Sequence, residues 1–210
     1  MNSRLRTMAV CVLMGLSSAT GATENVSIAQ IQETRIQTTM VTKIEEFVVA
    51  QKIDESWYYP NIPIDREVQR FVHSYSERTK IPELLIYAQI KCESNFKSDL
   101  IGSDGDTGYL QILKSNQKFL EREMKREINL LDEYDNIESG MLLLYYNLSN
   151  LEDYNGKEKY IRALNVYNMG SSNYNRVAKN KGWNSWHYGK RVYACYEQYL
   201  EGNFDYDPYK

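Results

Sequence analysis

The sequence is poor in the residues that most metal sites and nucleophilic sites need. Its 210 residues include 2 His and 3 Cys, and His73 and His187 lie far apart in the chain. No cysteine pair has the spacing of a zinc ligand set. The pair Asp104-x-Asp106 lacks the third acidic position and the terminal Glu of a calcium loop. The sequence therefore predicts neither a metal site nor a nucleophilic triad.

Proline, glycine and charge of one sign are also scarce. The chain has 4 Pro and 11 Gly, and 25 Lys and Arg against 28 Asp and Glu give a net charge of −3. This balance offers no basic face for nucleic acid, so we expect no nucleic-acid partner. The hydrophobic fraction of 42% and the charged fraction of 25% are ordinary for globular proteins. They exclude wholesale disorder and a multi-span membrane protein.

What the sequence has in excess is tyrosine, with 18 Tyr beside 5 Phe and 3 Trp. Tyrosine combines an apolar ring with a polar tip, so it suits interfaces, sugar-like ligands and partly wet cores. The length is enough for one domain with a real core and an appendage.

Residues 1–22 have the layout of a secretory signal peptide. Arg4 and Arg6 form a short basic end, an apolar stretch up to Leu16 follows, and small residues end the segment at Ala22. The apolar run is too short to span a bilayer. We therefore expect export to the periplasm, the cell wall or the exterior, without an integral membrane span. Without this segment the charge would be −5, because only two basic residues are removed.

Export would leave two cysteines, Cys92 and Cys195. An oxidising compartment permits a disulfide between them. Closing a loop of about 100 residues would stabilise the fold by roughly 4.7 kcal/mol through loop-closure entropy. Two buried thiols that act as small apolar side chains are equally compatible with the sequence. The two alternatives stay open at this point.

The rest of the chain divides into an extension, a domain and a tail. Residues 23–56 contain no Gly or Pro and permit helix, either as a stalk or as a helix docked on the domain. Pro60 and Pro63 then force extended backbone before them. We expect a helical extension and linker at 23–60, a domain at 61–200 and a tail at 201–210. The extension could contact a cell-envelope or phage assembly.

The domain is expected to be mainly α. Apolar residues at Val68, Val72 and Tyr75 follow the helical period and predict a helix over 65–78. A Gly- and Asp-rich stretch at 102–108 indicates a loop, and 109–113 is the one extended piece expected. Further helices are expected to begin at Pro82, to span 115–127, to be capped by Asp135 or Asn136, and to span 157–168 and 189–200.

Glu93 is the candidate for acid–base chemistry. It ends the helix that begins at Pro82, with Ile86 and Ile90 on its side. A carboxyl group among apolar neighbours is costly to ionise, so its pKa should rise. A raised pKa is what a general acid at neutral pH requires. From position alone, however, an ordinary solvated Glu is the better interpretation.

Four short motifs around and beyond Glu93 change that balance. They are Glu93-Ser94-Asn95-Phe96, Gly108-Tyr109-Leu110-Gln111-Ile112, Asn136-Ile137-x-x-Gly140 and Val166-Tyr167-Asn168-Met169-Gly170. The series resembles the catalytic domain of the soluble lytic transglycosylases, which is related to goose-type lysozyme, over roughly residues 64–200. Each motif is short, but four in this order are specific. Tyr109 and Leu110 replace the usual Leu-Met of the family, and Val166 replaces Ala.

The resemblance implies a single lysozyme-like helical domain and a set of site residues. Glu93 matches the one catalytic acid and base, and Tyr188 matches a tyrosine that orients it. Gln111 matches a glutamine that hydrogen-bonds the sugar. The positions with an implied substrate-binding role are Ser94, Gln111, Tyr109, Tyr167, Asn168 and Tyr188. Trp183, Trp186 and Tyr174 could either stack on sugar rings or serve the core or surface.

The implied reaction is cleavage of the MurNAc–GlcNAc bond of peptidoglycan without water, leaving 1,6-anhydro ends. Glu93 would act first as acid and then as base, with no metal or organic cofactor. Ordinary glycosidases need two carboxylates, and the sequence context supports only one. Two alternatives remain. One is a goose-type lysozyme that hydrolyses the same bond with an Asp from 99–106 holding the water. The other is a non-catalytic peptidoglycan-binding module.

Overall fold

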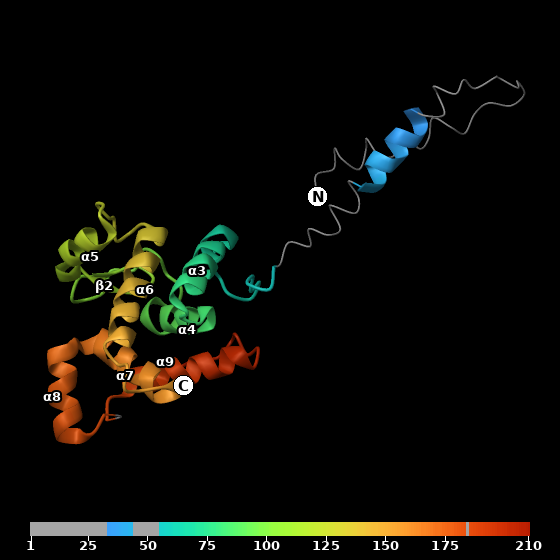
Figure 1. The fold of residues 1–210 in the computed structure, drawn as a ribbon. Helices are drawn as coiled ribbons and strands as arrows, with labels where there is room; N and C mark the ends of the chain where they lie inside the picture. Colours follow the sequence, from blue (N-terminus) through green and yellow to red (C-terminus); the bar gives the residue numbers. More distant parts are fainter. Residues whose placement is uncertain (1–32, 44–54, 184) are drawn as a thin grey trace, which may run out of the picture. The chain divides into compact units, whose positions relative to one another are not determined.

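The computed structural model describes residues 33–43, 55–183 and 185–210. The chain divides into two compact units, residues 1–53 and 54–210. In the first unit, residues 33–43 form a helix whose side chains are exposed (Figure 1). The expected signal peptide lies outside the described residues, as do large parts of the expected extension. No helix in the described ranges is long and apolar enough to cross a bilayer.

The second unit is mainly helical, as predicted (Figure 1). Its elements are α3 (Arg66–Thr79), α4 (Glu83–Ser94), β1 (Asp106–Thr107), β2 (Ile112–Leu113), a 3₁₀ turn (Lys114–Asn116), α5 (Gln117–Met124), α6 (Glu133–Ser149), α7 (Gly156–Met169), α8 (Ser171–Lys181) and α9 (His187–Leu200). The two strands are antiparallel, with Asp106 opposite Leu113 and Thr107 opposite Ile112. The helices therefore carry the core, and the short hairpin lies in the loop after α4.

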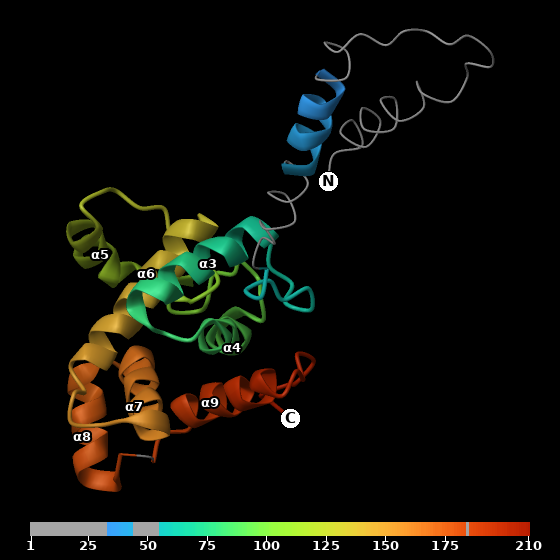
Figure 2. The same ribbon diagram turned by 45° about the vertical axis from the view of Figure 1, so that its right-hand side comes forward.

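Helix α4 is buried along most of its length. Leu85, Ile86, Ala88 and Ile90 are fully buried, on several sides of the helix. A helix that is apolar all round is one that other elements enclose. Figure 2 shows α4 between α3 and α9, and α9 in turn packs against α7. This packing holds the end of α4, where Glu93 lies, in a fixed position relative to α9.

Helix α6 begins earlier than the sequence indicated. Its N-cap is Asp132, whose carboxylate accepts hydrogen bonds from the backbone N–H groups of Tyr134 and Asp135. The prediction of a cap at Asp135 or Asn136 is wrong because both side chains have other partners. Asp135 pairs with Arg126, and Asn136 points into the domain.

Helix α8 was not predicted. Its sequence, SSNYNRVAKNK, has no apolar stripe, and Tyr174 is its buried residue. Glycines with positive φ, Gly170 at 76° and Gly182 at 88°, separate it from α7 and from the segment before α9. Since helix periodicity is a signal of burial, a helix exposed on most sides gives little of it. The extended piece expected at 109–113 is likewise shorter, because Tyr109–Gln111 form a turn before β2.

The end of the chain packs on the domain. Phe204 contacts the rings of Tyr59 and Tyr199, at centroid distances of 5.9 and 5.3 Å. Tyr209 donates a hydrogen bond from its hydroxyl to the backbone carbonyl of Cys92. Cys92 and Cys195 are both buried free thiols, and they hydrogen-bond to each other between α4 and α9.

Candidate active site

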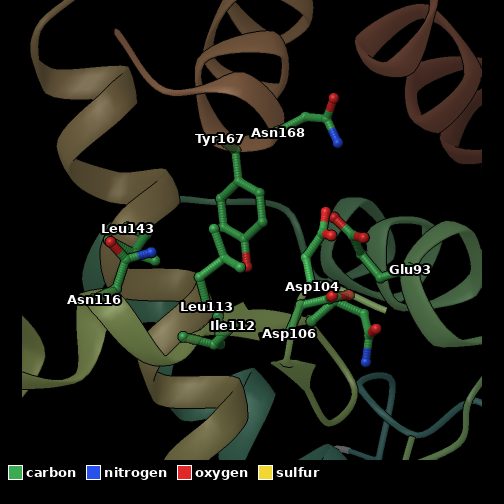
Figure 3. A pocket seen from close by; sticks show the side chains of 10 residues that line it. Glu93, Asp104, Asp106, Ile112, Leu113, Asn116, Leu143, Tyr167 and Asn168 are labelled. Atoms are coloured by element: carbon green, nitrogen blue, oxygen red, sulfur yellow. The ribbon is translucent and has the colours of Figure 1, made fainter. Parts of the chain in front are cut away.

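A pocket of about 170 Å³ opens beside the end of α4 (Figure 3). Helix α4 contributes Glu93, the loop after it contributes Asp104 and Asp106, and α7 contributes Tyr167 and Asn168. The remaining lining residues are Gln111, Ile112, Leu113, Asn116 and Leu143. In Figure 3 the three acidic side chains lie on one side of the Tyr167 ring, and Asn116 and Leu143 lie on the other. The pocket thus has an acidic wall and a partly apolar wall.

Glu93 lies in the last turn of α4. The helix ends at Asn95, which adopts the left-handed conformation at φ 49°, and Phe96 follows at φ 63°. The carbonyl groups at a helix C-terminus disfavour a nearby negative charge. The fold therefore places this carboxyl group where ionisation is unfavourable, before any neighbouring side chain is considered.

The surroundings raise the pKa of Glu93 to about 7. Burial is the largest cause, and the negative charge of Asp106 acts in the same direction. The hydrogen bond from Tyr188 and the positive charge of Arg191 oppose it. A carboxyl group with this pKa holds a proton in about half of the molecules at neutral pH, so it can both donate and accept one.

Two tyrosines hold the acid and the pocket wall in place. Tyr188, in the first turn of α9, donates its hydroxyl hydrogen to Oε1 of Glu93. Burial and the neighbouring Glu93 raise the pKa of Tyr188 well above its ordinary value, so it remains a donor. Tyr167 donates to the carbonyl oxygen of Leu110 at 2.7 Å, which fixes its ring in the pocket wall.

The loop that carries the acidic wall is tied to α6 by Asn136. Its Nδ2 donates to the carbonyl oxygens of Thr107, at 2.7 Å, and of Leu130, at 2.8 Å. Its Oδ1 accepts from the N–H of Leu110 at 2.8 Å. One turn along the helix, a Cβ on Gly140 would lie 2.3 Å from Leu110. Asn136 and Gly140 lie one turn apart on α6, and together they hold the 107–110 turn against this helix.

Five of the seven expected site residues line this pocket or contact its acid. Glu93, Tyr167 and Asn168 line the pocket, and Tyr188 holds Glu93. Gln111 also lines the pocket, but its Nε2 donates to the carbonyl oxygens of Leu100 and Gly108, at 3.1 and 2.8 Å. The amide nitrogen of Gln111 thus stabilises the loop, which its positive φ of 45° also helps to turn.

The two other expected residues, Ser94 and Tyr109, lie outside the lining. Ser94 follows Glu93 on the helix, so it points about 100° away, and its hydroxyl donates to the carbonyl of Ile90 at 3.2 Å. Tyr109 is buried, and its hydroxyl donates to Glu133 at 3.0 Å. Both hydroxyl groups thus have a partner within the protein.

Asp104 and Asp106 are the site residues that the sequence analysis missed. In the loop sequence they are most simply turn formers, and only the hydrolytic alternative gave this region an acid in the site. The pairing of β1 with β2 folds the loop back, so that both carboxylates face the pocket of Glu93. Among the described residues, no group of three or more His, Cys, Asp or Glu side chains is arranged to hold a metal ion.

Comparison with solved structures identifies the class of fold. The chain is similar to the 70 kDa soluble lytic transglycosylase from Escherichia coli, with a TM-score of 0.53 and 17% identity. That match covers 68% of this chain and 25% of the other. An inactive mutant of the lytic transglycosylase Slt from Pseudomonas aeruginosa gives a TM-score of 0.52 and 20% identity, over 83% of this chain and 30% of the other. The domain therefore has the lysozyme-like fold of these enzymes, and the chain spans about a quarter to a third of their length.

The sequence itself gives the family. Residues 70–188 match the family model described as Transglycosylase SLT domain, which covers more than half of the chain. This chain belongs to that family. The match extends from α3 to Tyr188 and so includes every residue of the pocket. No curated protein matches the sequence.

Proposed function

We propose that this chain is a peptidoglycan lytic transglycosylase with Glu93 as its acid and base. The observation that carries the proposal is the state of Glu93, which lies in an open pocket with a pKa of about 7. Membership of the SLT family supports the substrate, the glycan strand of peptidoglycan. Ser94 and Tyr109 then support the fold around the site, and Gln111, Tyr167 and Asn168 are the residues that meet the glycan.

The proposed reaction has two proton transfers. Protonated Glu93 donates its hydrogen to the oxygen between MurNAc and GlcNAc, and the bond from that oxygen to C1 of MurNAc breaks. The N-acetyl group of MurNAc stabilises the cation that develops at C1. The carboxylate of Glu93 then takes the proton of the MurNAc 6-hydroxyl, whose oxygen forms the new bond to C1. Glu93 returns to its protonated state, and water is not consumed.

Hydrolysis of the same bond is the second candidate, because Asp104 and Asp106 share the pocket with Glu93. Inverting glycosidases use a second carboxylate to activate a water molecule. The sequence analysis gave this role, in the hydrolytic alternative, to an Asp from 99–106, and Asp104 and Asp106 both fall in that range. Asp106 also has another effect, since its charge raises the pKa of Glu93 and so favours the protonated acid.

The mass of the products separates the two reactions. Purified peptidoglycan is digested with the protein, and the released muropeptides are analysed by mass spectrometry. We expect 1,6-anhydro-MurNAc ends, which are lighter than the hydrolytic products by one water. Ends that are all reducing would overturn the transglycosylase proposal in favour of hydrolysis, and the absence of any product would favour a binding module.

The variant Glu93→Gln tests the role of Glu93 in the same assay. We expect lysis to be abolished while the thermal unfolding curve stays cooperative, because glutamine keeps the shape and loses the proton. Glu152→Gln is the matched control, since Glu152 is exposed and outside the pocket. Undiminished lysis by Glu93→Gln would refute the assignment of Glu93.

Peptidoglycan lies outside the cytoplasm, so we propose that the protein acts there after export. Residues 1–22 serve as the signal peptide in this proposal, and residues 23–60 link the domain to a cell-envelope or phage assembly. N-terminal sequencing of the exported protein is expected to give Thr23 as the first residue. A mature chain that still begins at Met1 would exclude cleavage after Ala22.

A further inference from the structure

The three aromatic residues that could stack on sugar, Tyr174, Trp183 and Trp186, have different surroundings in the structure. Tyr174 is 4% exposed, and its hydroxyl accepts a hydrogen bond from Arg162 at 3.2 Å. The guanidinium group of Arg162 also lies over the ring of Trp183, 4.7 Å from its centroid. Both aromatic residues thus have Arg162 of α7 as a partner within the protein.

Trp186 differs from both. It is 41% exposed, which is unusual for the largest apolar side chain. Its indole Nε1–H donates to Oδ1 of Asn168 at 2.9 Å, and Asn168 lines the pocket of Glu93. In the described part of the chain, no aromatic ring or cationic group stacks on the Trp186 ring. Its exposed face is therefore open beside the rim of the pocket.

The position of Trp186 is fixed from two sides. It is the residue before the first turn of α9, and the same turn carries Tyr188, which holds Glu93. On the other side, Asn168 at the end of α7 orients the indole through its hydrogen bond. A ring that is held in place before binding loses little conformational entropy when a ligand stacks on it.

We propose that Trp186 is the stacking platform of a glycan subsite at the rim of the Glu93 pocket. Its ligand is an N-acetylated pyranose of the strand, beyond the sugars that flank the bond to be cleaved. One face of such a pyranose is rich in C–H groups, which pack against an aromatic ring, while its hydroxyl groups stay in water. The proposal rests on the proposed function in taking a glycan strand as the ligand.

Binding without cleavage provides the test. The Glu93→Gln chain is titrated with N-acetylglucosamine oligomers of two and four sugars by calorimetry, with and without Trp186→Ala. Because stacking on one ring is a modest contact, we expect Trp186→Ala to weaken binding of the tetramer roughly fivefold. A dimer bound to the two positions that flank the cleaved bond does not occupy the further subsite at Trp186, so we expect its affinity to change little.

Two further variants separate stacking from the hydrogen bond and from general loss of aromatic surface. Trp186→Phe keeps a ring without the N–H group, so we expect an affinity between those of Trp186 and Trp186→Ala. Tyr145→Ala is the matched control, because Tyr145 is also 41% exposed but lies outside the pocket lining. Equal tetramer affinity for Trp186→Ala and the unaltered Trp186 chain would overturn the proposal.

Lysis distinguishes this inference from the proposed function. In the active chain, Trp186→Ala is expected to raise KM for peptidoglycan with little change in kcat, since the contact is made equally before and during reaction. If the unaltered chain releases no product, the proposed function fails, while the tetramer titration still decides the subsite. If the unaltered chain lyses peptidoglycan and Trp186→Ala changes neither KM nor tetramer affinity, the subsite alone fails.

Discussion

Tyr188 donates a hydrogen bond to Glu93 between the first turn of α9 and the last turn of α4. The two residues are 95 positions apart in the sequence. Burial alone would push the pKa of Glu93 upward, and this bond opposes the effect by stabilising the carboxylate. The pKa of about 7 is thus a balance: burial and the charge of Asp106 raise it, and the Tyr188 hydrogen bond and the charge of Arg191 lower it.

Removing the hydroxyl group of Tyr188 should raise the pKa of Glu93. In Tyr188→Phe the carboxylate loses its hydrogen bond, so the pKa of Glu93 rises above about 7. In the proposed reaction Glu93 must be protonated at the start, so activity is expected to fall as pH rises through this pKa. We expect the descending limb of the rate against pH to move to higher pH, with a lower kcat because Glu93 is less well oriented.

The check is a pH profile of lysis between pH 5 and about 9. A structural effect without electrostatic coupling would lower kcat at every pH and leave the limb in place. Arg191 offers a second comparison, since its charge also lowers the pKa of Glu93. Arg191→Gln is expected to move the limb in the same direction as Tyr188→Phe.

Replacement of Asp106 should move the descending limb of the pH profile to lower pH. The charge of Asp106 raises the pKa of Glu93, so Asp106→Asn lowers it and the loss of activity begins at lower pH. Asp99→Asn is the control, because Asp99 is exposed and lies outside the pocket lining. A limb that moves upward, or stays in place, would contradict the electrostatic coupling. If Asp106 instead activates water, the variant loses hydrolytic product at every pH.

The sequence predicted the helices that bury an apolar stripe and missed the one that does not. α3, α4, α7 and α9 all lie close to their expected positions, because each packs one or more faces against the core. α8 buries Tyr174 and offers no period. Hydrophobic patterning reports burial, so it gives little signal for a helix whose one buried residue is Tyr174, the partner of Arg162.

The lining of the candidate site was predictable where it depends on residue type and order, and not where it depends on side-chain direction. Glu93 stood out through the motif that follows it. Asp104 and Asp106 face the pocket only because the β1–β2 pairing folds the loop back. Ser94 and Tyr109 match the motif but point elsewhere, since the helix rotation and Glu133 decide their directions. The spacing of the motifs in the sequence shows neither the folding of the loop nor the directions of these side chains.

The raised pKa of Glu93 also has a cost in stability that depends on pH. The pKa is about 7 in the fold and 4.5 as the ordinary value, which corresponds to about 3 kcal/mol. Below the ordinary value the group is protonated in both states, and no cost arises. Between about 4.5 and about 7 the unfolded chain has released a proton that the fold retains, so stability falls as pH rises through this range. The loss is complete above about 7, where the carboxyl group is ionised in both states.

We therefore expect Glu93→Gln to be more stable than the unaltered chain at high pH. The gain in the free energy of unfolding should approach about 3 kcal/mol above the pKa of about 7 and be small near pH 4. Urea unfolding at a series of pH values measures it, with Glu152→Gln as the exposed control. A difference that is independent of pH would show that Glu93 is not desolvated in the fold.

Gly189 allows the first turn of α9, which also carries Tyr188, to approach α7 closely. A Cβ at Gly189 would lie 2.4 Å from the carbonyl oxygen of Ile161 and 2.8 Å from Oδ1 of Asn165. The N–H of Gly189 donates to that same Oδ1 at 2.8 Å. Because the nearest atom belongs to the backbone, a methyl group here forces the first turn of α9 away from α7.

Gly189→Ala should therefore destabilise the fold, although alanine favours helix over glycine by about 1 kcal/mol. Overpacking of this kind typically costs about 1–3 kcal/mol, and the displaced turn carries Tyr188 with it. We expect a lower midpoint in urea and, in the folded fraction, a descending pH limb shifted upward as in Tyr188→Phe. Lys190→Ala is the control, since the neighbouring Lys190 is exposed. A Gly189→Ala chain as stable as Lys190→Ala, with an unmoved limb, would mean that the contact between α7 and α9 does not position Tyr188.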